Sequence, residues 1–465
     1  MKKIFALSLL TMAAALAFNS CSPAEEDDIF DKSAAERLNE ASELYSKRLM
    51  ASPNGWAMQL YPTTENEYPY GNGYLLLCRF NKDFSVNVSM NNVFSDNKYI
   101  EHTSLWEVLT DNGPVLSFNS HNNCIHAFSD PYDVLFTGTA EIPNDESGVG
   151  VGGDYEFIIV DAPEDASYMM LKGKKRGAYD LLTPIEEGIT YKDYLEDVQG
   201  FQNKMFSPSS PTFDVLHLKD ETFKVTGADD GIPNIFPYDG DEIIDESFNA
   251  FLITKRGNDY YLRFRDKMNV EDDLTVQEFV YLPEKDIFQA VESEDCFIEG
   301  DVPARYFMQT LEAQSSKWDF DKESDRFAAI VAALNENFNS FSTSNAKYSY
   351  NKSLLRVDNG VPILQIVYSV KVTKPKSQQT MSVNYAYKAE RNGDMVRFVY
   401  DQPVTVGDSS AELAASMFNF VPAIQQMINY FGQEFNVGAS ETRFLLNNIK
   451  LSPTSDPNAW VTLKQ

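Results

Sequence analysis

Apolar and polar residues alternate along this chain with two different periods. Within residues 34–49 the apolar side chains recur every three or four positions and form one helical stripe, made of Ala34, Leu38, Ala41, Tyr45 and Leu49. Ser33 and Glu36 have the spacing of a capping box, and Pro53-Asn54-Gly55 interrupts the pattern. We therefore predict a helix that begins just after Ser33 and ends before Pro53.

From position 56 to about 184 the period changes to 2, as in half-buried β-strands. Turn signals at 70–73 and 111–114 separate short alternating runs. The predicted strands are 56–61, 74–80, 85–90, 99–109, 115–118, 155–160 and 168–172. Sequential hairpins of this kind predict an antiparallel up-and-down sheet or a partly closed barrel.

A helix over 191–206 and a second β-rich stretch follow. An acidic loop is predicted over 227–247, and the predicted strands around it are 213–218, 222–226, 248–255, 260–264 and 276–282. The periodicity leaves open whether 56–300 forms one closed barrel or two packed sheets.

Between positions 300 and 322 the β pattern yields to helical stretches. Helices are predicted around the stripe at 327–338 and over 410–431, and strands over 348–357, 362–372, 380–389, 395–400, 443–451 and 460–463. Core contacts are expected from Met417, Phe418, Phe420, Ile424, Met427 and Phe431. We predict a mainly β fold: a β-rich antiparallel domain with an N-terminal helix over 31–300, then a smaller α+β domain over 301–465.

The N-terminus carries a lipoprotein signal. Lys2 and Lys3 precede an apolar run over 4–18 that is too short to span a bilayer, and Ser20 supplies the small residue before Cys21. Residues 1–20 are predicted to be a signal peptide, and Cys21 the lipidated start of the mature chain; an ordinary secretory signal is the alternative. The acidic tether over 21–30 resembles the export signal of surface-exposed lipoproteins of the Bacteroidetes, so we expect a lipid-anchored protein on the outer face of an outer membrane.

Charge narrows the classes of partner. The 465 residues carry a formal net charge of −30. A polyphosphate needs a basic stripe, and the sequence shows none, so nucleic acid is not an expected partner and membrane attachment is assigned to the acyl chains. With 43% apolar and 13% aromatic residues, the chain can bury substantial cores.

Lipidation of Cys21 would leave Cys78, Cys124 and Cys296. Three cysteines allow at most one disulfide, and their wide spacing excludes a paired Cys-x-x-Cys zinc or redox site. Cys78 lies within an apolar run and is expected to be buried as a small hydrophobic residue. Whether any two of the three form a disulfide stays open.

Five segments together resemble the Bacteroidetes lipoprotein family labelled domain of unknown function 4302. They are Asp-Lys-Ser-Ala-Ala-Glu-Arg at 31–37 followed by Gly-Trp at 55–56, Gly-Pro-Val-Leu-Ser-Phe at 113–118, His-Ala-Phe-Ser-Asp-Pro at 126–131 and Gly-Gly-Asp-Tyr-Glu-Phe at 152–157. The resemblance implies a surface or periplasmic lipoprotein, often encoded beside an uptake system built from a TonB-dependent transporter and its substrate-capturing lipoprotein. It implies no activity and no catalytic residues.

Candidate chemistry is sparse. His121 and His126 are the only close pair of histidines, and a turn between them would be needed for both to bind one metal, with Asp130 or Asp133. The glycines at 148–153 precede a strand rather than a helix, so they indicate a bulge or a close backbone crossing instead of a phosphate-binding loop. The acidic clusters at 229–230 and 239–242 lack the spacing of a calcium loop.

Aromatic residues give the one indication of a ligand. Tyr61, Tyr68 and Tyr70 lie near prolines and an Asn-Gly turn, where a loop can present flat rings to a polysaccharide or peptide. The alternative is that these rings pack over the edge of the sheet.

The signal, the acidic tether and the lack of a recognisable catalytic set favour a non-catalytic accessory or binding component of an outer-membrane uptake system, without a cofactor. The expected partners are the membrane, through Cys21, and a TonB-dependent transporter with its capture lipoprotein. Two alternatives stay open: a hydrolase of extracellular polymer with a carboxylate site, and a metal- or haem-scavenging module that uses His121 and His126.

Overall fold

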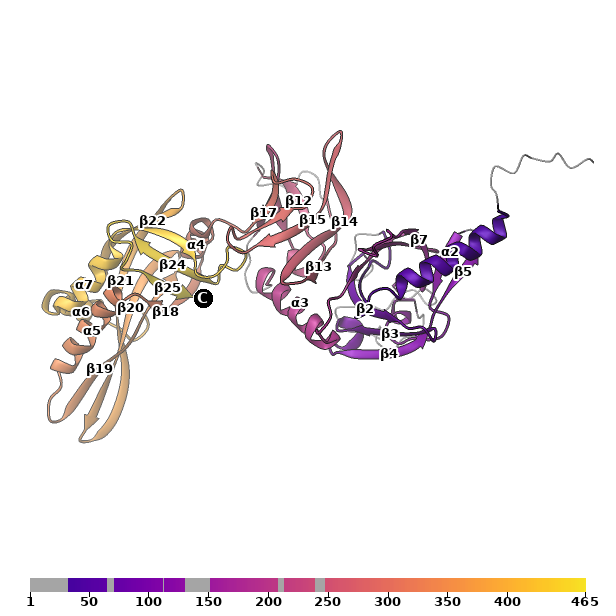
Figure 1. Ribbon diagram of the computed structural model, residues 1–465. Helices are drawn as coiled ribbons and strands as arrows, with labels where there is room; N and C mark the ends of the chain where they lie inside the picture. The colour runs from indigo at the N-terminus through magenta and orange to yellow at the C-terminus, as the bar shows by residue number, and fades with distance from the viewer. Residues whose placement is uncertain (1–31, 65–70, 112, 130–150, 208–212, 239–246) are drawn as a thin grey trace, which may run out of the picture.

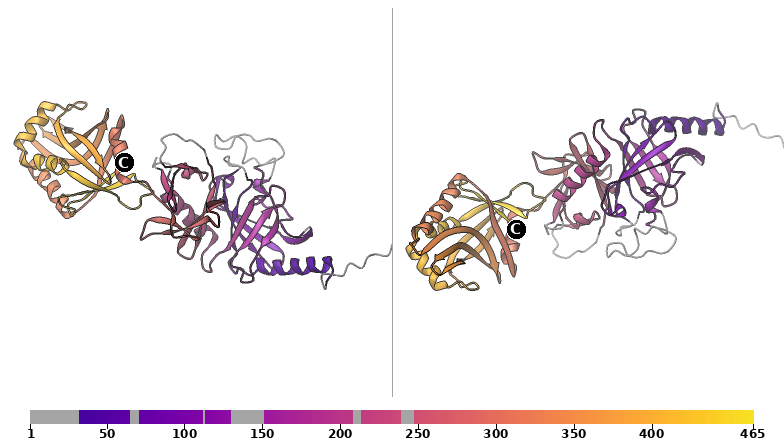
Figure 2. Two further views of the ribbon diagram at one scale, coloured as in Figure 1. Left: turned by 90° about the horizontal axis from the view of Figure 1, so that it is seen from above. Right: turned by 90° about the horizontal axis from the view of Figure 1, so that it is seen from below.

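The computed structural model describes residues 32–64, 71–111, 113–129, 151–207, 213–238 and 247–465. Three β units follow one another along an elongated molecule, with the N-terminal helix at one end and the C-terminal unit at the other (Figure 1). Views from above and below show the same succession (Figure 2). A helix precedes the strands of each unit: α2 (Ala34–Leu49), α3 (Tyr191–Met205) and α4 (Pro303–Glu312).

The first unit is a nine-stranded antiparallel sheet in the order β4-β3-β2-β1-β9-β8-β7-β6-β5. Its strands are β1 (Trp56–Leu60), β2 (Tyr74–Phe80), β3 (Ser85–Met90), β4 (Ile100–Leu105), β5 (Glu107–Asp111), β6 (Gly113–Ser117), β7 (Glu156–Asp161), β8 (Met169–Gly173) and β9 (Tyr179–Pro184). The first strand pairs with the last, so the sheet curls like an up-and-down barrel and is open between β4 and β5. Two 3-10 helices lie at Val93–Ser95 and His126–Phe128.

The helix α2 begins where the sequence predicts. The Ser33 hydroxyl accepts the Glu36 backbone N–H at 3.3 Å, and the Ser33 N–H donates to the Glu36 carboxylate at 2.9 Å, so the predicted capping box is confirmed. The helix lies over β5 and β6, where the Ser42 hydroxyl donates to the Val108 carbonyl oxygen at 2.7 Å. Leu49, the last residue of the apolar stripe, is fully buried.

One predicted strand of this unit is wrong, and the error shows how the sheet closes. The run 99–109 forms two strands, β4 and β5, which lie at opposite edges of the sheet. Trp106 lies between them, 1% exposed, with its ring centre 5.0 Å from that of Phe80. Burial of this indole bends the chain at the point where the sequence continues its alternation.

The second unit repeats this topology with eight strands in the order β12-β11-β10-β17-β16-β15-β14-β13. They are β10 (Asp214–Leu218), β11 (Glu221–Thr226), β12 (Asn234–Pro237), β13 (Phe251–Arg256), β14 (Asp259–Glu271), β15 (Leu274–Leu282), β16 (Ile287–Ala290) and β17 (Cys296–Glu299). Again the first strand pairs with the last, and the sheet is open between consecutive strands, β12 and β13. Residues 56–300 therefore form two separate sheets.

The predicted acidic loop over 227–247 is wrong for part of its length. It contains a 3-10 helix at Ala228–Asp230 and the strand β12, which pairs with β11. Apolar Ile235 and Phe236 are buried in this short strand, although acidic residues surround them in the sequence. The acidic cluster at 239–242 lies outside the described residues.

The third unit is a closed barrel of eight antiparallel strands. They are β18 (Ser315–Glu323), β19 (Ala346–Asp358), β20 (Val361–Thr373), β21 (Lys376–Asn392), β22 (Met395–Pro403), β23 (Glu434–Ala439), β24 (Asn448–Pro453) and β25 (Val461–Lys464). The helix α5 (Asp325–Ser340) packs on β19. Strands β19, β20 and β21 are much longer than the others and project beyond the barrel (Figure 1).

The predicted single helix over 410–431 is wrong. It consists of α6 (Ala411–Phe420) and α7 (Pro422–Phe431), separated at Val421, whose backbone is extended. Pro422 cannot donate a backbone hydrogen bond and disfavours helical geometry in the residue before it. Phe420, expected in the core, ends α6 and is 80% exposed.

The predicted fold class is confirmed: the chain is mainly β and antiparallel, with an N-terminal helix and a C-terminal part that combines helices with strands. Cys78, Cys124 and Cys296 are buried and free, as expected for Cys78. Within the described ranges, no helix combines the length and the apolar character that crossing a bilayer requires.

Candidate ligand-binding cleft between two β units

A cleft of about 770 Å³ lies where the first two β units meet, and we call it the junction cleft. Strands β8 and β9 line one wall, and strands β13, β14 and β15 line the other. The outer face of β1, next to β9, packs through Ala57 against the apolar core of the second unit. The lining is therefore drawn from both units.

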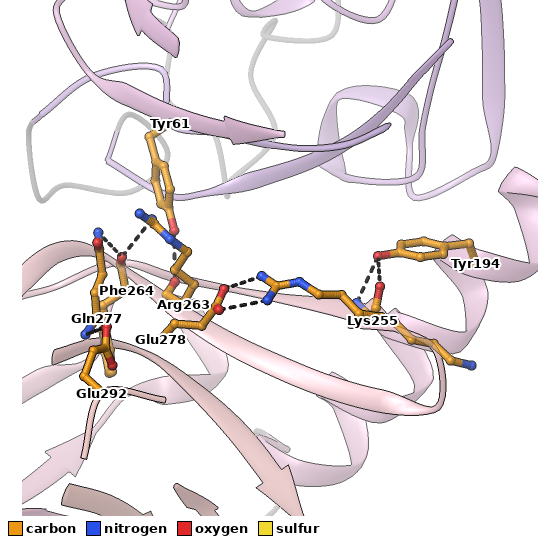
Figure 3. A network of polar contacts seen from close by, with 9 residues as sticks. Tyr61, Tyr194, Lys255, Arg263, Phe264, Gln277, Glu278 and Glu292 are labelled. Carbon is orange, nitrogen blue, oxygen red and sulfur yellow. Dashed lines mark hydrogen bonds and ion pairs between the residues drawn. The ribbon is translucent and has the colours of Figure 1, made fainter. Parts of the chain in front are cut away.

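Tyr61 connects the two walls from the end of β1. Its backbone N–H donates to the Asp180 carboxylate at 2.7 Å, and its hydroxyl donates to the Arg263 carbonyl oxygen at 3.1 Å, as its ring reaches across the boundary (Figure 3). The residue is 1% exposed, and burial raises the pKa of its phenol. The ring of Tyr61 is therefore packed inside the molecule, in agreement with the alternative of packing against the sheet, and is not presented on the surface. Tyr68 and Tyr70 lie outside the described residues.

Arg263, on β14, is the unusual charge of the junction cleft. It is 8% exposed, and its Nη1 donates to the Phe264 carbonyl oxygen at 3.5 Å. No carboxylate of the described residues lies within ion-pair distance, although Glu278 and Glu292 are near enough to favour its charge. Burial lowers the pKa of the guanidinium, because a buried charge loses its hydration. Buried cations are normally paired with an anion. Because Arg263 has no such partner among the described residues, its guanidinium has N–H donors left for a ligand.

The polar side chains around Arg263 already form hydrogen bonds and ion pairs with one another or with the backbone. Arg256 donates to both carboxylate oxygens of Glu278, with Nη1 at 2.9 Å from Oε2. Gln277 donates to two backbone carbonyl oxygens of β14 at 3.0 and 2.8 Å. Figure 3 shows these contacts along one wall of the cleft. They fix the wall in place, so Arg263 is held in position before any ligand binds.

Three further polar side chains at this junction have no hydrogen-bond partner among the described residues. The Thr183 hydroxyl, on β9, lines the cleft in a residue that is 4% exposed. Gln59, two residues after Ala57 on the same face of β1, and Thr254, on β13, are fully buried. Since buried polar groups are normally hydrogen-bonded, such exceptions mark positions for water or a ligand.

Asp180 lies beside this site, where burial disfavours its negative charge. The carboxyl is buried and has one partner, the Tyr61 N–H, while its Oδ2 has none among the described residues. Burial raises its pKa well above the ordinary value, and Asp154 adds to the shift. A protonated Asp180 would not repel an anionic ligand bound at Arg263.

A protein-family profile described as "Domain of unknown function (DUF4302)" matches residues 26–283, more than half of the chain. The chain belongs to the DUF4302 family. The match includes the first unit and the second unit as far as the end of β15, and so both walls of the junction cleft. Membership in DUF4302 assigns no role to any residue, and no curated protein matches the chain.

A second cleft, of about 630 Å³, also lies between the two units of the DUF4302 region. Its lining is rich in carboxamides: Asn72, Asn91, Asn92, Asn97, Gln199, Gln202 and Asn203. The Asn91 amide donates to Gln199 Oε1 at 3.2 Å and so joins the first unit to α3. Carboxamides both donate and accept, which suits hydroxylated ligands.

The structure brings His121 and His126 together. The rings of His121 and His126 lie 5.3 Å apart, and the His126 ring stacks on Tyr155 at 4.9 Å. His121 contacts the Asn123 amide oxygen at 3.1 Å. No third metal ligand joins them among the described residues, and Asp130 and Asp133 lie outside that part of the chain.

Proposed function

We propose that this protein is a surface-tethered lipoprotein, anchored through Cys21, that binds a ligand without transforming it and serves as an accessory component of an outer-membrane uptake system. The lipoprotein signal that ends at Cys21 and the acidic residues after it support the tether. The observation that carries the binding role is Arg263, a buried guanidinium in a cleft between two units that has no carboxylate partner among the described residues.

The chemistry of the cleft indicates the class of ligand. A guanidinium forms strong, charge-assisted hydrogen bonds to carboxylates. On the facing wall lies the Thr183 hydroxyl, which has no hydrogen-bond partner in the described part of the chain. A cleft of about 770 Å³ has the size of a small-molecule site. An oligosaccharide or a peptide that carries a carboxylate therefore fits the junction cleft.

Titration of the purified protein with two probes, tri-galacturonate and trialanine, tests the binding role. We expect the wild type to bind one of them and Arg263→Met to bind it about tenfold to a hundredfold more weakly, since a hydrogen bond to a charged group contributes about 1.5–3 kcal/mol. Arg263→Met keeps the volume of the side chain and should fold at least as stably, because replacing a buried charge with an apolar residue is often stabilising. Equal affinity of the two proteins for both probes would remove the role given to Arg263.

Purification of the lipidated protein from gently solubilised native membranes tests the accessory role. Recovery of a transporter and a capture lipoprotein in stoichiometric amount, absent from a Cys21→Ala control, is the expected result. Recovery of the protein alone would contradict the accessory role, whatever the titration shows.

A further inference from the structure

The long strands of the third unit carry a charge opposite to that of the rest of the chain. Between residues 337 and 389 only Asp358 is acidic, whereas the basic residues are Lys347, Lys352, Arg356, Lys371, Lys374, Lys376 and Lys388. This segment has a formal charge of +6 in a chain of −30, which leaves −36 for the remainder. The expectation from net charge, that no basic stripe exists, does not hold for this segment.

The pairing of the strands concentrates four of these lysines at one tip. Lys347 on β19 lies directly opposite Lys371 on β20, and Lys376 on β21 lies opposite Thr373 next to the turn that holds Lys374. All four lysines are exposed, and the described ion pairs include none of them. We call residues 346–350 and 369–380 the basic finger.

Like charges directly opposite in an antiparallel pair are unfavourable. Lys352, farther along β19, is compensated by Asp319 at 2.9 Å, but Lys347 and Lys371 have no such carboxylate among the described residues. A 13-residue strand such as β19 spans about 43 Å. The Debye length is about 8 Å at physiological salt, so the field of the tip is largely separated from that of the acidic body.

We propose that the basic finger binds an acidic polysaccharide. Alternation places the exposed Ser349, Gln378 and Thr380 on the same outer face as Lys347 and Lys371, through the register of the three strands. This face offers cations together with hydroxyl and carboxamide groups, and it carries no large apolar side chain at the tip. A protein interface normally centres on buried aromatic residues, and surface-bound membrane helices insert apolar ones, so a hydrated polyanion rich in hydroxyls fits this face better.

The basic finger is distinct from the junction cleft, and its proposed role does not depend on that cleft. The finger projects from the end of the molecule opposite the N-terminal helix (Figure 1). If the chain is anchored at Cys21, the finger lies at the end of the molecule away from the anchor. Its contacts would be mainly ionic, so binding should weaken steeply as salt is added.

The test compares the wild type with a variant that carries Lys347→Gln, Lys371→Gln, Lys374→Gln and Lys376→Gln. A matched control carries Lys47→Gln, Lys82→Gln, Lys175→Gln and Lys464→Gln, which removes the same charge from exposed lysines that also lack described ion pairs. Binding is measured by titration with polygalacturonate and with heparin. Neutral dextran, polyglutamate and phosphatidylglycerol vesicles are the comparison probes.

We expect the wild type to bind polygalacturonate or heparin, and to bind it about 50-fold more weakly at 200 mM than at 50 mM NaCl if four lysines are engaged. The finger variant should lose about tenfold or more of its affinity at 50 mM salt, while the control variant and a quadruple Lys→Arg finger variant retain theirs. Circular dichroism and the melting temperature establish that all variants are folded. No binding to either polysaccharide, an equal loss in the control, or tighter binding to vesicles or polyglutamate would overturn the proposal.

Discussion

Arg263 in the junction cleft and Lys371 in the basic finger are both cations without a carboxylate partner among the described residues, but their surroundings differ. Arg263 is 8% exposed between two β units, whereas Lys371 is exposed on a projecting strand. Leaving a buried charge unpaired costs several kcal/mol, and leaving an exposed one unpaired costs little. The same missing partner therefore indicates a specific, water-excluding ligand at the junction and a hydrated, salt-sensitive one at the finger.

Removing the ring of Tyr61 should produce the largest effect on the junction side of this comparison. Because the side chain is 1% exposed and contacts both units, Tyr61→Ala should lower the free energy of unfolding by about 3–5 kcal/mol. Tyr61→Phe, the matched control, keeps the ring and loses one hydrogen bond, which costs about 1 kcal/mol. Urea denaturation of both variants checks the prediction, and similar losses would show that the ring itself contributes little.

Adding bulk at Gly73 should push the first two β units apart, because Gly73 of the first unit lies against Leu252 of the second. A Cβ at this position would lie 2.6 Å from Leu252 and 2.7 Å from the Tyr61 ring, so Gly73→Val must push these side chains apart. We expect a loss of about 2 kcal/mol by urea denaturation, in the range typical of overpacking. Gly200→Ala is the control, because Gly200 lies in α3 with open space around it. A wild-type stability for Gly73→Val would mean that Gly73 is not in tight contact with Leu252 and Tyr61.

The buried Asp180 gives the junction a pH dependence that the exposed finger lacks. Its pKa is raised by burial, so the folded protein holds this proton more tightly than the unfolded chain does. The contribution of Asp180 to stability is therefore fully present below the ordinary pKa of about 3.9 and is lost as the pH rises towards the higher native pKa. Asp180→Asn should remove this component and raise the urea midpoint at pH 7.

Denaturation of wild type, Asp180→Asn and the exposed control Asp272→Asn across pH 4.5–8 measures this difference. Other buried carboxyls such as Asp214 contribute equally in all three proteins, so the comparison isolates Asp180. Parallel pH profiles for wild type and Asp180→Asn would contradict the raised pKa.

Reversing one charge in the finger should have the smallest effect on stability. Lys371→Glu converts the like-charged pair with Lys347 into an opposite pair and should stabilise the protein by at most about 0.5 kcal/mol, an increment that 0.5 M NaCl should reduce. Lys374→Glu, in the turn, serves as the control with the same charge change. A destabilisation above 1 kcal/mol for Lys371→Glu would show that the finger is not the tolerant surface described here.

Local patterns predicted much of the fold. The capping box at Ser33 fixed the start of α2, and an apolar run and clean alternation located β2 and β3, respectively, at the bounds that the structure shows. The errors arise where a distant contact decides: Trp106 bends an alternating run because it is buried against Phe80. The close backbone crossing expected at the glycine-rich segment is confirmed at Gly153, where a Cβ would lie 2.3 Å from Phe128.

The candidate site was harder to predict. Arg263 and Arg265 alternate on β14 with the buried Leu262 and Phe264, and this regular placement of charge within a strand is the one signal that the sequence offers. It does not reveal burial, because the facing wall comes from β9, about 80 positions earlier in the chain. The net charge of the whole chain likewise concealed the basic finger, since a sum over 465 residues averages out a local excess.

The pairing of first and last strands also sets how the molecule would respond to tension. Trp56 lies opposite Pro184, and Val215 lies opposite Glu299, so the chain enters and leaves each of the first two units at the same end of a strand pair. A pull between the membrane anchor and a polymer held by the finger would load these hydrogen bonds one after another rather than all together. We expect two separate low-force openings in single-molecule stretching, one for each of the first two units.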